Sequence, residues 1–170
     1  GAYTVEETVY DITGKSVTVT YSTGTVKDAD GKGAKVKADV KKGATETVAY
    51  KDDYTNDKGD LEITKTVTGY TDATKTYKFE VKDEAGNWYD KSGKKSSSKV
   101  TIELKAGETV TLKGLVVGNY TVTEDKEDAK VSGYGLTVSG SPATPKVKKN
   151  DTAVVNVTNA YTKDKANLKI

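Results

Sequence analysis

Apolar and polar residues alternate along most of this chain, the pattern of β-strands that bury one face. The second half shows it at residues 61–69, 75–83, 99–105, 108–113, 118–125, 133–139 and 152–161. The first half shows it near residues 3–10, 16–22, 34–40 and 45–51. Clusters of Gly, Ser, Asn and Asp separate these segments, and no helical periodicity intervenes. The pattern therefore predicts an all-β chain folded as an antiparallel β-sandwich.

Three of these strands place one polar side chain on their apolar face. These are Lys65 in phase with Leu61, Ile63 and Val67; Glu124 in phase with Tyr120 and Val122; and Asn159 in phase with Val155 and Val157. Asn156 has the opposite parity and is expected to face outward. Because buried polar groups need partners, we expect the lysine, glutamate and asparagine to meet in one core.

An internal repeat relates the two halves of the chain. The segment from Val48 to Ile63 aligns with Val155 to Ile170 at a constant offset of 107 residues, since 159 − 52 = 107. Residues 1–7 similarly read like residues 118–124. We therefore interpret residues 1–57 as the C-terminal half of one repeat, 58–165 as a complete repeat and 166–170 as the start of a third. The tandem arrangement predicts a piece of a longer polypeptide.

Composition narrows the class of protein. Lysine and arginine number 27 against 25 acidic residues, and the signs are interspersed, which gives no reason to expect a nucleic-acid partner. The chain has no cysteine and no histidine, which removes disulfides, thiol nucleophiles and the usual general base. No apolar run is long enough for a membrane span. We expect no cofactor, no metal and no conventional enzyme; Asp28 and Asp30 open a calcium-like loop, but no bidentate glutamate follows.

Four blocks in order carry a family resemblance: residues 61–69, 104–115, 118–124 and 155–161. They resemble the Cna B-type, prealbumin-like domain of Gram-positive surface adhesins and pilins. The resemblance implies a spontaneous isopeptide bond between a first-strand lysine and a last-strand asparagine, assisted by a glutamate. By position these are Lys65, Asn159 and Glu124. It also implies an extracellular location on the bacterial cell surface or cell wall.

Burial would prepare each member of this trio for amide formation. A low-polarity site disfavours the ammonium form of Lys65 and favours the neutral form of Glu124, which could then carry protons to leaving ammonia. Holding the amine against the amide supplies the proximity advantage. The alternative is purely structural: Lys65 extends to the rim, Glu124 is a strand-end charge and Asn159 caps a turn.

Residues 1–57 keep part of the same pattern. Glu7 is in phase with Tyr3 and Val5, and Asp52 occupies the position that aligns with Asn159. No lysine-bearing first strand precedes them in this chain. Three alternatives remain open: the strand lies upstream, another molecule supplies it, or this half folds differently.

These features favour a structural stalk or fibre-shaft module of an adhesin or pilus. Its partners would be neighbouring repeats of the same polypeptide or fibre. The alternative is an adhesive module that binds host matrix protein or glycan directly, for which Trp88 and Tyr89 are the only candidate platform. The sequence leaves open whether a sortase-built pilus or a single-chain adhesin is the parent.

Overall fold

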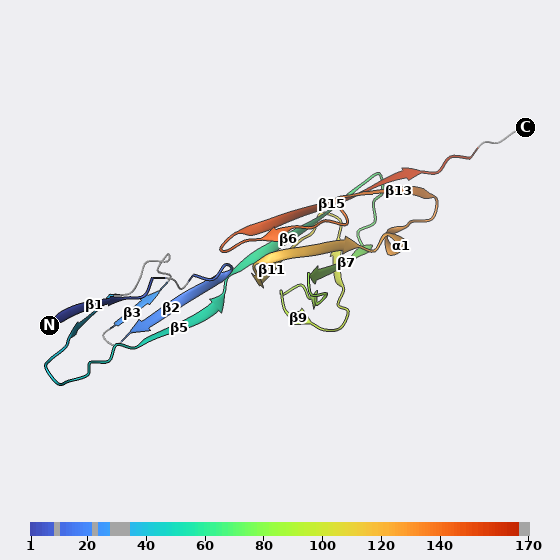
Figure 1. Ribbon diagram of the computed structural model, residues 1–170. Helices are drawn as coiled ribbons and strands as arrows, with labels where there is room; N and C mark the ends of the chain where they lie inside the picture. Colours follow the sequence, from blue (N-terminus) through green and yellow to red (C-terminus); the bar gives the residue numbers. More distant parts are fainter. Residues whose placement is uncertain (9–10, 22–23, 28–34, 167–170) are drawn as a thin grey trace, which may run out of the picture. The chain divides into compact units, whose positions relative to one another are not determined.

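The computed structural model describes residues 1–170 except 9–10, 22–23, 28–34 and 167–170. The chain divides into two compact units, Gly1–Asp57 and Lys58–Ile170. Strands make up nearly all of the regular structure, as the alternating pattern predicts (Figure 1). No helix in the described part of the chain is long and apolar enough to cross a membrane. The expected turn at Asp28 and Asp30 and most of residues 166–170, which are predicted to open a third repeat, lie outside the described residues.

Lys58–Ile170 is a β-sandwich. One sheet has the order β11-β6-β15-β13, built from β6 (Lys58–Thr68), β11 (Thr109–Val116), β13 (Tyr134–Ser139) and β15 (Thr152–Lys163). The other has the order β14-β12-β7-β8-β9, built from β7 (Thr76–Asp83), β8 (Trp88–Tyr89), β9 (Lys95–Ser96), β12 (Gly118–Glu124) and β14 (Lys146–Val147), with β10 (Ile102–Lys105) on β7. Side chains of both sheets form one core, including the fully buried Leu61, Phe79, Val122 and Val157.

One strand pair departs from the antiparallel prediction. β15 lies parallel to β6 over nine residue pairs, with Val157 opposite Lys65 and Asn159 opposite Val67. A parallel pair needs a long crossover between its strands. Here the intervening strands of the unit supply it, because β6 and β15 are its first and last strands. This pairing brings two segments about ninety residues apart side by side.

Gly1–Asp57 contains two small sheets. One pairs β1 (Ala2–Glu6) with β4 (Lys35–Asp39), and the other has the order β3-β2-β5, from β2 (Lys15–Tyr21), β3 (Gly24–Lys27) and β5 (Tyr50–Asn56). The predicted strand at 45–51 is wrong in position, and β3 was not predicted. The strand lies instead at Tyr50–Asn56, because β5 pairs with β2 in antiparallel register. This register runs from Tyr21 opposite Tyr50 to Lys15 opposite Asn56. Pairing thus overrides the low strand propensity of Asp52 and Asp53.

A single turn of helix, α1 (Lys126–Ala129), follows β12. The Asp125 side chain caps it, because its Oδ1 accepts hydrogen bonds from the Glu127 and Asp128 amides at 3.0 and 3.1 Å. The helix places Ala129 in the core, where its carbonyl accepts a hydrogen bond from the Tyr161 hydroxyl. This hydrogen bond links the end of β15 to the helix that follows β12 of the other sheet.

Candidate buried reaction centre

Three strands of the sandwich bring the three predicted residues together. Lys65 comes from β6, Glu124 from the end of β12 and Asn159 from β15. Their exposed fractions are 0%, 2% and 0%, so none reaches the rim. Alternation explains the burial, since each shares the inward face of its strand with core residues. The structural alternative in which Lys65 extends to solvent is therefore wrong.

The side-chain nitrogens of Lys65 and Asn159 both contact one carboxylate oxygen of Glu124. Lys65 Nζ lies 2.7 Å from Glu124 Oε1, and Asn159 Nδ2 donates a hydrogen bond to that same oxygen at 3.0 Å. Glu124 therefore holds the lysine and the asparagine on one atom. Nearby, the Glu124 amide donates to Ser141 Oγ at 2.7 Å, which fixes the end of β12. Nothing in the sequence pattern points to Ser141.

Three atoms of the trio remain without a hydrogen bond among the described residues. They are Lys65 Nζ, Glu124 Oε2 and Asn159 Oδ1. The contact of Nζ with Oε1 is close enough for an ion pair but does not have the angles of a hydrogen bond. Buried polar atoms without partners are uncommon and costly. Their coincidence in one site suggests groups arranged for chemistry rather than for stability alone.

The surroundings of Lys65 favour a neutral amine. Burial lowers the pKa of Lys65 below its ordinary value of 10.5, and the contact with the Glu124 carboxylate opposes that shift only in part. Two aromatic rings lie close, with the centroid of Tyr77 at 4.6 Å and that of Phe79 at 6.0 Å from Nζ. Both rings come from β7, whose alternation is visible in the sequence without revealing this contact. They exclude water from the amine.

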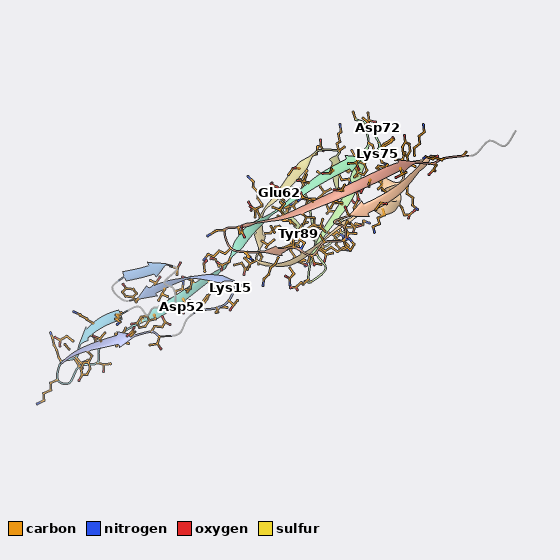
Figure 2. The ribbon with its side chains drawn as sticks, turned by 90° about the horizontal axis from the view of Figure 1, so that it is seen from above. Lys15, Asp52, Glu62, Asp72, Lys75 and Tyr89 are labelled. Carbon is orange, nitrogen blue, oxygen red and sulfur yellow. The ribbon has the colours of Figure 1, made fainter. Side chains whose placement is uncertain are left out.

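The structure also brings Glu7 and Asp52 together, in the other unit. Both side chains are half-buried. Asp52 Oδ2 accepts a hydrogen bond from Tyr54 at 3.1 Å, while Asp52 Oδ1 and Glu7 Oε2 are buried without a partner among the described residues. Burial, and then the charge and hydrogen bonding of Asp52, raise the pKa of Glu7 above 4.5. Figure 2 labels Asp52 on β5.

Trp88 and Tyr89 do not form an exposed platform. Tyr89 is 6% exposed, packs edge-on against Tyr120 with ring centroids 5.3 Å apart, and donates to Asp83 Oδ2 at 3.0 Å. Trp88 is half-buried, and its Nε1 donates to Glu80 Oε2 at 3.2 Å. Asn156, the rival amide, is exposed as its parity predicts. These residues contribute to packing and surface, and the trio remains the site with unusual chemistry.

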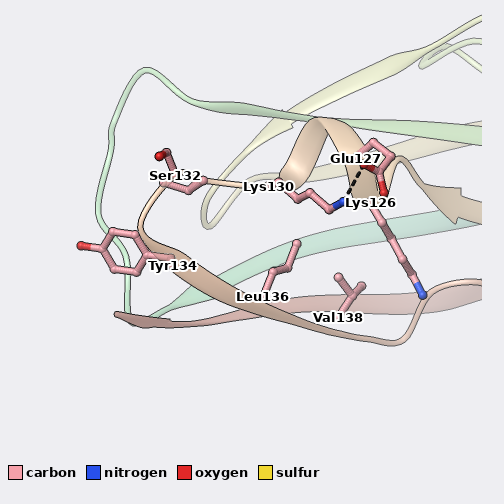
Figure 3. Close-up of a pocket in the computed structure, with 8 residues that line it drawn as sticks. Lys126, Glu127, Lys130, Ser132, Tyr134, Leu136 and Val138 are labelled. Carbon is pink, nitrogen blue, oxygen red and sulfur yellow. Dashed lines mark hydrogen bonds and ion pairs between the residues drawn. The ribbon is translucent and has the colours of Figure 1, made fainter. Parts of the chain in front are cut away.

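A hollow lies beside α1 (Figure 3). Its lining consists of Lys126, Glu127, Lys130, Val131, Ser132, Tyr134, Leu136 and Val138. Val138 lies opposite Asn159 in the β13–β15 ladder, so the hollow reaches the strand next to the trio. No member of the trio lines it, and Lys130 pairs with Glu127 across its mouth at 2.6 Å. We therefore place the candidate centre in the sandwich interior.

Comparison with solved structures finds streptococcal pilus proteins. The minor pilin GBS52 of Streptococcus agalactiae matches with a TM-score of 0.48 and 16% identity over 89% of this chain and 63% of that one. The major pilin T3.2 of Streptococcus pyogenes matches with a TM-score of 0.47 and 18% identity over 96% and 67%. A pilus-presented adhesin, Spy0125, matches with a TM-score of 0.44 and 20% identity over 80% of this chain. This chain spans 36% of that adhesin's length.

At the level of sequence, the chain matches a family model but no curated protein. No curated protein matches the chain. One family model does, over residues 59–161, which begins within β6 and ends within β15 and so includes all three strands of the trio. The match covers more than half of the 170 residues. The chain therefore belongs to the family described as a domain of unknown function, DUF7601.

Proposed function

We propose that Lys58–Ile170 is a load-bearing module of a bacterial surface stalk or pilus shaft, closed by a self-formed isopeptide bond between Lys65 and Asn159. The observation that carries the proposal is the buried trio, in which Glu124 Oε1 holds the lysine amine and the asparagine amide at 2.7 and 3.0 Å. The resemblance of four sequence blocks to Cna B-type domains supports it. The proposed location is the extracellular face of a Gram-positive cell, with neighbouring repeats or fibre subunits as partners.

The reaction is a transamidation. The neutral Lys65 Nζ attacks Asn159 Cγ, a C–N bond forms, and the bond from Cγ to Nδ2 breaks to release ammonia. Glu124 acts as the proton carrier, taking a proton from the attacking nitrogen and giving one to the leaving nitrogen. A proton on its unpaired Oε2 would donate to the unpaired Asn159 Oδ1 and polarise the carbonyl, which gives both atoms their missing partner.

Two features of the site support this chemistry. Burial lowers the Lys65 pKa, which favours the neutral, nucleophilic amine in a chain that has no histidine or cysteine base. The parallel β6–β15 ladder fixes the backbones that carry the amine and the amide, which provides the proximity that such a reaction requires. The reaction occurs once per molecule and consumes no external substrate, so the module is not an enzyme in the usual sense.

A covalent bond between β6 and β15 would determine how tension passes through the module. Lys65 is on the first strand of the unit and Asn159 on the last. Tension applied at the two ends of the unit would then pass from strand to strand through a covalent link. The residues between 65 and 159 would carry no load, and the sheets would not separate.

Pulling single molecules between residues 58 and 163 tests this role. The parent is expected to show no unfolding extension from the segment 65–159. A Lys65→Ala variant is expected to release that segment, roughly 300 Å of extended chain. The matched control is Lys78→Ala, since Lys78 also pairs with a carboxylate at 2.7 Å but is exposed. A parent that extends like Lys65→Ala would contradict the proposed function.

A further inference from the structure

Four polar or charged side chains are buried among the described residues, and three of them form the trio. The fourth is Ser141, which is 9% exposed. The proposed reaction gives a role to Lys65, Glu124 and Asn159 and none to this serine. A buried hydroxyl group is costly unless it has a partner. The partner of Ser141 is the acid of the trio, since the Glu124 amide donates a hydrogen bond to Ser141 Oγ at 2.7 Å.

Ser141 takes the place of a backbone acceptor along one edge of β12. On this edge the amides of Tyr120 and Val122 donate to backbone carbonyls of residues 143–145, both at 2.9 Å. Amides on the same edge of a strand recur every second residue, so the next one belongs to Glu124. That amide meets the side chain of Ser141 instead of a carbonyl. A serine hydroxyl therefore completes this edge at the residue that carries the acid.

The residue before Ser141 lies against β15, the strand that carries Asn159. Gly140 follows the end of β13, which pairs with β15, and its φ of 77° lies in the left-handed region. A Cβ at this position would lie 2.0 Å from the carbonyl oxygen of Asn156, so the close approach requires glycine. The turn at Gly140 and Ser141 thus contacts both the strand of the amide and the strand of the acid.

The other edge of β12 is held by β7. Glu124 lies opposite Phe79, and the Asp125 amide donates to the Lys78 carbonyl at 2.8 Å. β12 ends at Glu124, so no later residue of the strand adds a ladder bond beyond the acid. Strand ends open locally at a lower cost than strand interiors do. Loss of the Ser141 hydroxyl would therefore release one edge of the Glu124 backbone while β7 keeps the other edge in place.

We propose that Ser141 is a positioning residue of the buried reaction centre. Its hydroxyl holds the Glu124 backbone so that Oε1 contacts the Lys65 amine at 2.7 Å and the Asn159 amide at 3.0 Å. The inference rests on the proposed function, because it concerns the rate of the same reaction. Ser141 acts through the Glu124 backbone and takes no part in the proton transfers. Such geometry matters because a displacement of about 1 Å can slow a positioned reaction about 100-fold.

The rate of bond formation in the full chain tests this role. The chain is made by cell-free synthesis, samples are quenched in acid at timed intervals, and intact mass gives the fraction that has lost about 17 Da. Ser141→Ala is expected to slow the loss about 10- to 100-fold relative to the parent. Ser139→Ala is the matched control, because Ser139 is exposed two residues earlier, and it is expected to react at the parent's rate. A Ser141→Ala chain that reacts as fast as the parent would overturn the inference.

Two further variants separate the hydroxyl group from the space that it fills. Ser141→Cys keeps the size of the side chain but offers sulfur, a weak acceptor, so this variant is expected to react slowly. Ser141→Thr keeps the hydroxyl and is expected to restore most of the parent's rate. A threonine variant as slow as the alanine and cysteine variants would contradict a role for the hydroxyl.

Stability is measured separately in a Lys65→Ala background, where the bond cannot form. Urea unfolding with and without Ser141→Ala is expected to show that both chains are folded under the conditions of the rate measurement. A rate that falls only in proportion to the folded fraction would show a purely structural role and overturn the inference. A parent that never loses about 17 Da would overturn the proposed function itself, a result distinct from a reacting parent matched by Ser141→Ala.

Discussion

The two units carry aligned acidic residues in different surroundings. In Lys58–Ile170 the acid and the amide hold a lysine, and all three side chains are buried. In the described part of Gly1–Asp57 the aligned Glu7 and Asp52 interact with each other, and both are only half-buried. The aligned tyrosines near the end of the last strand follow the same trend: Tyr161 is 5% and Tyr54 is 36% exposed. In Lys58–Ile170, β6 supplies the lysine and lies beside β15, and β7 lies beside β12.

The chemistry open to an acidic group depends on the side chains that neighbouring strands place beside it. Two carboxyl groups without a cation repel each other and favour a shared proton. A carboxyl group beside an amine and an amide has a substrate and a leaving group at hand. The same alternating pattern therefore accompanies a lysine, a glutamate and an asparagine in one unit, and a glutamate and an aspartate in the other.

Truncation of the aligned tyrosines is expected to change the free energy of unfolding of the two units by very different amounts. Tyr120→Ala is expected to destabilise its unit by about 3–5 kcal/mol, as for other buried aromatic side chains, whereas Tyr3→Ala is expected to cost less than about 0.5 kcal/mol. Chemical denaturation of each variant, monitored by residue-resolved hydrogen exchange, assigns the loss to a unit. Equal losses for the two variants would remove the distinction between a covered and an uncovered strand.

A smaller effect is expected from pH. The Glu7 pKa is raised in the folded chain, so the folded state holds this proton more tightly than the unfolded state. The resulting stability is fully present below pH 4.5 and is lost as pH rises through the raised pKa. Glu7→Gln should therefore flatten the decline in stability of Gly1–Asp57 above pH 4.5 and leave Lys58–Ile170 unchanged. Hydrogen exchange measured between pH 4 and 7 checks this, and parallel pH profiles for variant and parent would contradict it.

Periodicity in the sequence is enough to identify the trio. The inward parity of Lys65, Glu124 and Asn159 comes from counting residues in twos, and burial follows from it. Periodicity does not reveal which strand is the neighbour of which. The parallel β6–β15 pair and the aromatic cover from Tyr77 and Phe79 depend on long-range pairing, which leaves no local signal in the sequence.

Gly1–Asp57 is harder to predict for the same reason. Val48 and Tyr50 alternate and favour a strand at 45–51, but the ladder with β2 shifts it to Tyr50–Asn56. Residues that have low strand propensity, such as Asp53, are strand residues here because β2 pairs with them. Ser141 and the capped turn at Asp125 escape prediction because each acts through hydrogen bonds to the backbone rather than through a repeated pattern.

An intact mass of the purified chain, recorded beside a Lys65→Ala control and an Asn159→Asp variant, tests the isopeptide bond most directly. We expect the parent to weigh about 17 Da less than its sequence, the Asn159→Asp variant about 18 Da less than its own, and the Lys65→Ala control to match its sequence mass. A parent at its full sequence mass would contradict the proposed bond between Lys65 and Asn159. It would leave a β-sandwich in which Lys65, Glu124 and Asn159 remain unreacted at the centre.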